Sequence, residues 1–370
     1  MSFSVRRLRL LPVAACLALV SPAVAQSFDY DIDPASSPFT FSGTSNVGPI
    51  VGTPNTFDLD GSFALLGIFS GPLISSARFT GGDAMTVPGT LTGEVPGLIP
   101  GIPLATLAVR DLRISANSTF FSIGTGGDFA ATVTFTVIEG SVDFAPLIGA
   151  PGTVDITGLQ SAPTSVTGTL SQSESEAALT FLLDTAIPFD EPSLGVNGTI
   201  DLMGTVHAGF RFYEPFCFGD GSGTACPCGN ASPQGAEAGC LSSIGSGATL
   251  RASGLASVSS DTLQLQGAQM PATAPVLYFQ GSAPFGSGAG MPFGDGLLCA
   301  SGSVIRLGAK LNAGGASTFP TTGLSISTRG QIPSGGATRW YQGWYRNQAP
   351  EFCTADRFNL TNGLRITWVP

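Results

Sequence analysis

The sequence predicts an all-β protein made of two antiparallel β-sandwich or jelly-roll-like domains, on the basis of three observations. The chain has 50 glycines and 27 prolines in 370 residues, which is typical of a protein with many turns. It is 43% hydrophobic and only 11% charged, a balance that excludes an intrinsically disordered chain. It has a single lysine, Lys310, and this composition excludes a coiled coil or a helical bundle.

The N-terminus has the pattern of a cleavable secretory signal peptide over residues 1–25. Three arginines precede the apolar stretch Leu10–Val20, and the small residues Ala23–Ala25 form a cleavage site. Two alternative signals are considered. A lipoprotein signal would be cut before Cys16, but its apolar core would be unusually short. The adjacent Arg6 and Arg7 could instead belong to a twin-arginine export signal. No later run of about 18 apolar residues predicts a membrane-spanning helix. We expect a secreted, periplasmic or cell-surface protein.

The distribution of charge predicts two domains, 26–213 and 214–370. After the signal peptide the chain carries 12 basic and 25 acidic residues, a net charge of −13. The first domain has 18 acids against four arginines, whereas the second has seven acids against eight bases. This asymmetry favours a boundary near residue 213. It also argues against a nucleic-acid partner, which would need clustered basic residues.

All six cysteines that follow the signal peptide lie in the second domain. An even number of cysteines in an exported protein predicts disulfides. A zinc site is the alternative, but the cysteine pair at 226 and 228 has C-x-C spacing, and the only histidine, His207, lies outside the cluster. Six cysteines allow 15 pairings, and we expect the first four to pair among themselves and the last two to pair with each other. The cysteines are Cys217, Cys226, Cys228, Cys240, Cys299 and Cys353.

Alternation of apolar and polar residues predicts the strands of the first domain. Thr132–Val137 alternates strictly, and Glu139-Gly140 is expected to turn it into a second strand, Ser141–Phe144. Asn197-Gly198 is a favoured hairpin turn ahead of another alternating run that includes His207 on its polar face. Residues 173–184 are compatible with a strand or with a short helix, because serine and glutamate there resemble a capping box.

The second domain shows short β-rich runs between glycine-rich turns, which favours an antiparallel sandwich. The predicted strands are Val276–Phe279, Val304–Leu307, Leu324–Ser327, Trp340–Tyr345 and Leu364–Val369.

Over residues 216–370, the second domain resembles an uncharacterised, cysteine-bearing C-terminal module of exported planctomycete proteins. The resemblance implies an extracellular location and a fold style, and no catalytic residues. The first domain is not recognised, although Tyr30–Pro34 is similar to the start of lipid-binding YceI-like barrels. The matching segments of the module are Phe216–Gly221, Cys226–Asn230, Gly239-Cys240, Phe279–Gly281, Gly294–Gly296, Trp340–Arg346 and Asn359–Gly363.

Motifs that carry chemistry are scarce, so we expect no catalytic residue, no metal and no cofactor. There is no G-x-S-x-G elbow and no phosphate-binding loop, and His207 alone offers an imidazole. Alternating aspartates at Asp29–Asp33 and Asp58–Asp60 are too far apart on an extended strand to gather around calcium without a bend. A carboxylate-based glycosidase is the least improbable enzyme, with Glu94, Asp190 and Glu191 in loops.

The segment Arg339–Arg346 is the most specific candidate for a ligand-binding surface. On a strand, Trp340, Gln342 and Trp344 share one face, which could either fill the core or form an aromatic platform for sugar rings, with Arg339 and Arg346 as hydrogen-bond donors. We therefore expect a non-catalytic structural, adhesive or binding protein of the cell surface. Its partner could be a cell-surface polymer or glycan. The alternatives are a carbohydrate-binding or carbohydrate-active protein using this strand, and binding of an apolar ligand inside a first-domain barrel.

Overall fold

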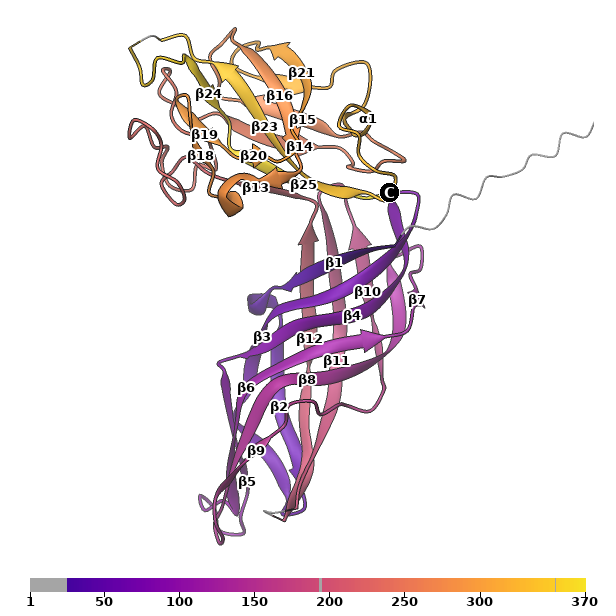
Figure 1. Cartoon of the computed structure of the whole chain (residues 1–370). Helices are drawn as coiled ribbons and strands as arrows, with labels where there is room; N and C mark the ends of the chain where they lie inside the picture. Colours follow the sequence, from indigo (N-terminus) through magenta and orange to yellow (C-terminus); the bar gives the residue numbers. More distant parts are fainter. Residues whose placement is uncertain (1–24, 193–194, 350) are drawn as a thin grey trace, which may run out of the picture.

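The computed structural model of the chain describes residues 25–192, 195–349 and 351–370 (Figure 1). The predicted signal peptide therefore lies outside the described residues, apart from Ala25. The all-β class is confirmed, because the chain folds into antiparallel sheets with a single four-residue α-helix among the described residues. None of the helices in the described part of the chain has the length and apolar character needed to cross a membrane.

The first domain is one twelve-stranded antiparallel sheet that closes on itself. Each strand pairs with the next around the ring β3–β4–β6–β8–β10–β11–β12, and β1 and β2 both join β12 back to β3. Its strands are β1 (Ala25–Ile32), β2 (Pro38–Ser45), β3 (Pro49–Ser70), β4 (Leu73–Val87), β5 (Thr90–Val95), β6 (Ala105–Ser118), β7 (Phe121–Ser122), β8 (Asp128–Pro146), β9 (Gly152–Asp155), β10 (Thr164–Gln172), β11 (Glu176–Glu191) and β12 (Val196–Arg211), with the 3-10 helix η1 (Pro34–Ser36) after β1.

The interior of the closed sheet is filled by aromatic side chains. Phe63, Phe79 and Phe181 are almost fully buried, and their rings contact one another with centroids 5.5 to 6.3 Å apart. Edge-to-face packing of this kind fills space at the density of a protein core. The filled interior gives no support to the hypothesis that an apolar ligand binds inside this domain.

The second domain packs a six-stranded sheet, in the order β13-β25-β23-β16-β21 with β24 beside β23, against the three-stranded sheet β14-β15-β22. Its elements are β13 (Tyr213–Phe216), β14 (Thr249–Ser253), β15 (Gln264–Ala268), β16 (Pro275–Gly281), β17 (Ala283–Pro284), η2 (Phe285–Gly288), β18 (Met291–Phe293), β19 (Gly296–Leu298), β20 (Ala300–Ser301), β21 (Ile305–Leu311), β22 (Ser317–Phe319), α1 (Ile326–Arg329), β23 (Ala337–Arg346), β24 (Phe358–Leu360) and β25 (Gly363–Trp368).

The two faces of the six-stranded sheet are covered to different extents. The inner face carries Tyr278, Tyr341 and Tyr345, which are buried against the three-stranded sheet. The other face, here called the outer face, carries Trp340, Gln342 and Trp344 and is covered in part by the disulfide-containing loops. Alternation along β23 thus places Trp340, Gln342 and Trp344 on one face, as predicted, and Tyr341 and Tyr345 on the other.

The six cysteines form three disulfides, Cys217–Cys299, Cys226–Cys240 and Cys228–Cys353. The expected pairing was wrong for two of the three bonds. Only the Cys226–Cys240 bond stays within the first four cysteines, and the other two span 82 and 125 residues. The long-range bonds hold the loop that follows β13 against β19 and against the segment before β24.

Two turns predicted in the first domain are wrong. Glu139-Gly140 lies inside the continuous strand β8 and forms no hairpin. The pairing of β8 with β6 is irregular at this point, around Arg113. Asn197-Gly198 lies inside β12 and pairs with the end of β11. The ambiguous segment after residue 173 is a strand, β11, and the backbone N–H of Glu176 donates to Ser173 Oγ across the turn that precedes it.

One predicted strand of the second domain is also wrong, because part of Leu324–Ser327 forms the helix α1. Ser325 caps this helix, and its hydroxyl accepts a hydrogen bond from the backbone N–H of Thr328. A capping serine at this place favours a helical turn over an extended strand.

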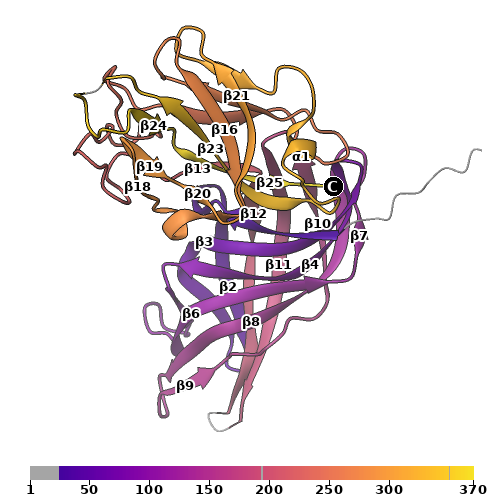
Figure 2. The ribbon, with the colours of Figure 1, turned by 45° about the horizontal axis from the view of Figure 1, so that its top comes forward.

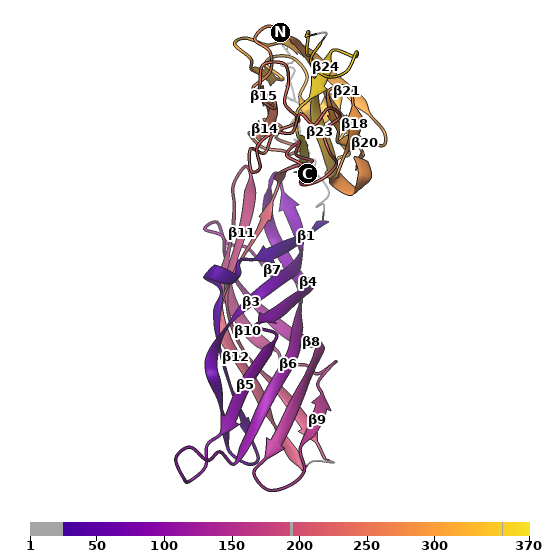
Figure 3. The same cartoon turned by 90° about the vertical axis from the view of Figure 1, so that its left-hand side faces the viewer.

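The two domains meet end to end, and the second domain lies across one end of the elongated first domain (Figures 2 and 3). Tyr213 packs against both hydrophobic cores. The backbone N–H of Thr367 donates to Phe212 O (2.9 Å), and Gln26 Nε2 donates to Trp368 O (3.3 Å). The C-terminal strand therefore forms part of the junction, and a pocket opens beside it.

Candidate functional site

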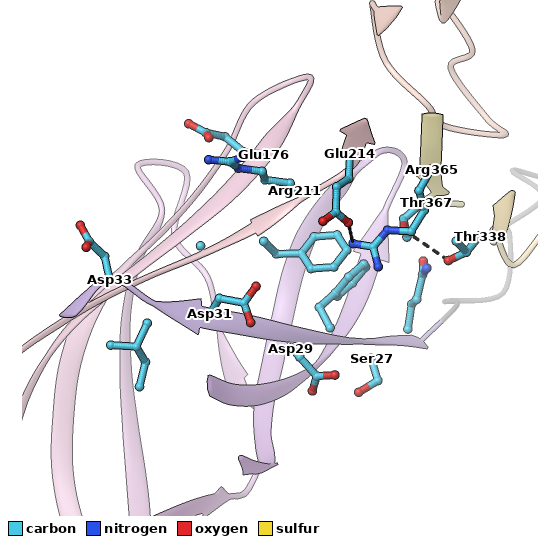
Figure 4. Close-up of a pocket in the computed structure, with 15 residues that line it drawn as sticks. Ser27, Asp29, Asp31, Asp33, Glu176, Arg211, Glu214, Thr338, Arg365 and Thr367 are labelled. Carbon is cyan, nitrogen blue, oxygen red and sulfur yellow. Dashed lines mark hydrogen bonds and ion pairs between the residues drawn. The ribbon is translucent and has the colours of Figure 1, made fainter. Parts of the chain in front are cut away.

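The junction pocket has a volume of about 730 Å³ and lies between β1, the end of β12 and the C-terminal strand β25 (Figure 4). Its floor includes Phe28 and Phe210, whose rings lie edge to face with centroids 4.8 Å apart. Asp29 and Asp31 lie two residues apart on β1 and therefore share one face of the sheet, and both line the pocket. The polar residues that line it are Gln26, Ser27, Asp29, Asp31, Asp33, Glu176, Arg211, Glu214, Thr338, Arg365 and Thr367.

The charges of the junction pocket are only partly balanced. Glu214 and Arg365 form an ion pair of 2.5 Å across the β13–β25 pairing. The Asp31 carboxylate points into the middle of the pocket (Figure 4). Partial burial raises its pKa above the usual value, the nearby Asp29 and Glu214 raise it further, and Arg365 opposes the shift. Ionisation of Asp31 is therefore less favourable in the folded protein than in the unfolded chain.

We expect Asp31→Asn to stabilise the protein slightly at neutral pH, by at most about 0.5 kcal/mol for so exposed a group. Because the pKa of Asp31 is raised on folding, its contribution to stability is complete below the unfolded pKa and is lost as pH rises through the folded pKa. The gain should therefore vanish below about pH 4. Thermal unfolding followed by circular dichroism at pH 7 and pH 3.5 measures it, with the exposed Asp58→Asn as control. A gain that persists at pH 3.5 would contradict the assignment.

The second candidate, here called the Trp344 groove, lies on the outer face of the second domain and has a volume of about 390 Å³. Leu277 and Trp344 are paired across β16 and β23, so their side chains stand next to each other in its wall. The Trp344 indole packs edge to face on Phe358, with ring centroids 5.2 Å apart. The groove is lined by Leu277, Phe279, Phe285, Phe293, Leu298, Ala300, Ser301, Gly302, Val304, Arg306, Trp344 and Leu360.

Arg306 is the only charged residue among the described residues that line the Trp344 groove. It is exposed, and its guanidinium makes no hydrogen bond or ion pair in the described part of the chain. The indole N–H of Trp344 is shielded from water and has no hydrogen-bond partner there either, so Trp344 offers a ligand its ring and not a donor. The groove is thus an apolar surface with one free cation at its rim.

Gln342, predicted to contact a ligand, is a structural residue instead. Its side chain is fully buried. Its Nε2 donates to Leu297 O and Thr361 O, both at 2.8 Å, and its Oε1 accepts from the backbone N–H of Cys299 at 2.9 Å. No part of this amide is available to a ligand, because the disulfide-containing loops cover it.

The other predicted binding residues are only partly brought together. Trp340 is half-buried and packs on the cluster that includes Phe279. Arg339 is half-buried and donates to the carbonyl of Thr338 at 2.9 Å. Arg346 is exposed and lines a smaller groove of about 140 Å³, which Leu277 and Trp344 also line. Of the five predicted residues, Trp344 alone lines the larger groove.

The sequence did not single out Arg306 or Phe293, which complete the groove. Alternation in Val304–Leu307 already placed Arg306 opposite the buried Leu307, and this pattern could have marked it as a residue of the outer face. The link to Trp344 depends on β16 lying between β21 and β23, which is a long-range pairing.

The residues considered for a glycosidase lie on strands and not in the loops where they were expected. Glu94 lies on β5, and Asp190 and Glu191 end β11, all away from the junction pocket. Across the described ranges, no group of three histidine, cysteine, aspartate or glutamate residues is arranged to hold a metal ion.

Comparison with known proteins adds no relative: no family model, no curated protein and no solved structure matches this chain. The resemblance of the second domain to the planctomycete module stays a prediction.

Proposed function

We infer that this is an exported, non-catalytic binding protein, and that its second domain holds an apolar group bearing a negative charge in the Trp344 groove. The observation that carries this proposal is the combination of an apolar groove with a single unpaired cation, Arg306, at its rim. Ligand pockets generally combine a mostly apolar lining with a few polar groups that fix orientation. The predicted signal peptide and the disulfides favour a place in the extracellular space or at the cell surface.

The chemistry of the groove favours an apolar anion over a sugar. A sugar site needs several donors and acceptors for hydroxyl groups, but among the described residues that line this groove the polar side chains are only Ser301 and Arg306. The described residues that line the groove include an exposed arginine and no carboxylate. A carboxylate on the ligand therefore gains an ion pair, whereas an ammonium group is repelled. An aromatic or aliphatic carboxylate, free or at the end of a peptide, has the required shape.

Two probes with the same apolar body and opposite charge test the proposal directly. Isothermal titration calorimetry on residues 25–370 should show 4-phenylbutyrate binding about tenfold more tightly than 4-phenylbutylamine, since attraction and repulsion at a surface charge each amount to about 0.5–1 kcal/mol. Cellohexaose serves as the carbohydrate probe. Equal binding of the two phenyl probes, or binding of cellohexaose alone, would contradict the proposal; the second result would favour a carbohydrate-binding protein.

Reversing the charge of Arg306 should reverse the preference. In Arg306→Glu we expect the amine to bind about tenfold more tightly than the carboxylate, with no loss of folding because Arg306 is exposed and has no partner in the described structure. The matched control is Arg211→Glu, which makes the same change in the junction pocket. If Arg211→Glu changes the preference and Arg306→Glu does not, the ligand binds at the junction and not in the groove.

A further inference from the structure

An exposed apolar surface is formed by loops at the end of the first domain opposite the second domain; Figure 3 shows where these loops lie. It consists of two loops, residues 96–104 between β5 and β6 and residues 147–151 between β8 and β9, and is called here the apolar tip. Leu98 is fully exposed at 100% and Ile148 is 90% exposed, values that are unusual for aliphatic side chains in contact with water. Its exposed aliphatic side chains are Leu98, Ile99, Ile102, Leu104, Leu147 and Ile148.

The two loops form one surface. Pairing of β6 with β8 continues to Ala105 and Pro146, and the backbone N–H of Leu147 donates to Leu104 O at 2.7 Å. The loops also satisfy part of their own backbone, because Ile102 N donates to Ile99 O at 3.0 Å and Leu104 N donates to Val95 O at 2.8 Å. Backbone groups that are already hydrogen-bonded lower the cost of moving a loop out of water.

The absence of charged residues from the apolar tip is the observation that identifies its partner. No residue from 95 to 109 or from 144 to 154 is charged. The closest arginine along β6 is Arg110, which lies five residues or roughly 17 Å beyond Ala105 and is paired with Asp143 at 2.5 Å. The neighbouring charged residues at the ends of β5 and β11 are all acidic: Glu94, Asp190 and Glu191.

We propose that the apolar tip inserts into the surface of a neutral or zwitterionic lipid membrane. Exposed leucine and isoleucine side chains on two loops that carry no charged residue fit the boundary between headgroups and acyl chains, into which such surfaces reach about 5–10 Å. An anionic membrane does not fit, because the tip offers no cation to lipid phosphates and the chain after the signal peptide carries a net charge of −13. Bound in this way, the second domain lies at the end of the molecule away from the membrane (Figure 1).

Cosedimentation of residues 25–370 with phosphatidylcholine vesicles tests this proposal. We expect binding that persists in 1 M NaCl and weakens when phosphatidylglycerol is added, because apolar insertion is not screened by salt and acidic lipids repel the protein. Leu98→Asp combined with Ile148→Asp should reduce the bound fraction about tenfold or more. Both side chains point into water, so neither change removes a contact of the core.

The matched control puts the same two charges elsewhere, with Leu73→Asp at the other end of the first domain and Leu311→Asp on the second domain. These side chains are also exposed, at 57% and 74%. Vesicle binding retained in the control and lost in the tip variant supports insertion of the tip. Absence of binding by the unaltered protein, equal losses in both variants, or a concentration-dependent dimer that only the tip variant abolishes would overturn the proposal, the last by assigning the tip to a second copy of the chain.

Discussion

Removing the Cys217–Cys299 or the Cys228–Cys353 disulfide is expected to lower the free energy of unfolding of the second domain by about 4–5 kcal/mol. The two bonds span 82 and 125 residues, so each removes much conformational freedom from the unfolded chain. The Cys226–Cys240 bond spans only 14 residues and should contribute about 3 kcal/mol. Each bond is removed by a double cysteine-to-serine substitution.

Guanidinium unfolding followed by tryptophan fluorescence measures these differences in the second domain alone. All three tryptophans of the chain, Trp340, Trp344 and Trp368, lie there. The short bond serves as the internal control, since its removal uses the same chemistry and changes a smaller loop. A larger loss for the short bond than for the two long bonds would show that the long-range pairing is not the main constraint on this domain.

Gln342→Leu should destabilise the second domain by about 3–6 kcal/mol. Leucine has a similar size but leaves the N–H of Cys299 and the carbonyls of Leu297 and Thr361 without partners in a buried place. Each unsatisfied buried group costs about 1–3 kcal/mol. The same fluorescence measurement applies, and the exposed Gln264→Leu on β15 is the control, with an expected change within about 0.5 kcal/mol.

The Gln342 result also separates a structural role from a ligand-binding role. A residue that only contacts a ligand would leave the free energy of unfolding unchanged and weaken binding. If Gln342→Leu is as stable as the unaltered protein, the hydrogen-bond network described for its amide is wrong and the residue returns to the binding surface.

The local pattern of the sequence predicted many strand interiors correctly but not where every strand ends or which strands pair. Alternation in Thr132–Val137 and Trp340–Tyr345 correctly identified strand interiors, because the period of two is a local property. Glu139-Gly140 has the composition of a turn, yet pairing with β6 on one side and β9 on the other keeps β8 continuous through it. Long-range pairing overrides turn composition at this point.

The candidate site shows the same division between local and long-range information. Strand alternation placed Trp340, Gln342 and Trp344 on one face correctly, but whether that face meets water depends on loops from elsewhere in the chain. The loop held by the Cys217–Cys299 bond covers Gln342, whereas the neighbouring Trp344 lines an open groove. Disulfide connectivity cannot be read from cysteine spacing, so the sequence could not predict which of these side chains is buried and which is exposed.

The indole N–H signals in a nitrogen-proton correlation spectrum give the most direct test of the Trp344 groove. The three tryptophans should give three signals, and Trp344→Phe assigns the one of interest. Addition of 4-phenylbutyrate should shift the Trp344 signal by the ring current of the probe. The Trp368 signal should stay in place, because its N–H donates to Tyr341 Oη (2.7 Å) inside the core. A Trp344 signal that does not move at saturating probe, or a Trp368 signal that moves as far, would contradict a binding site in this groove.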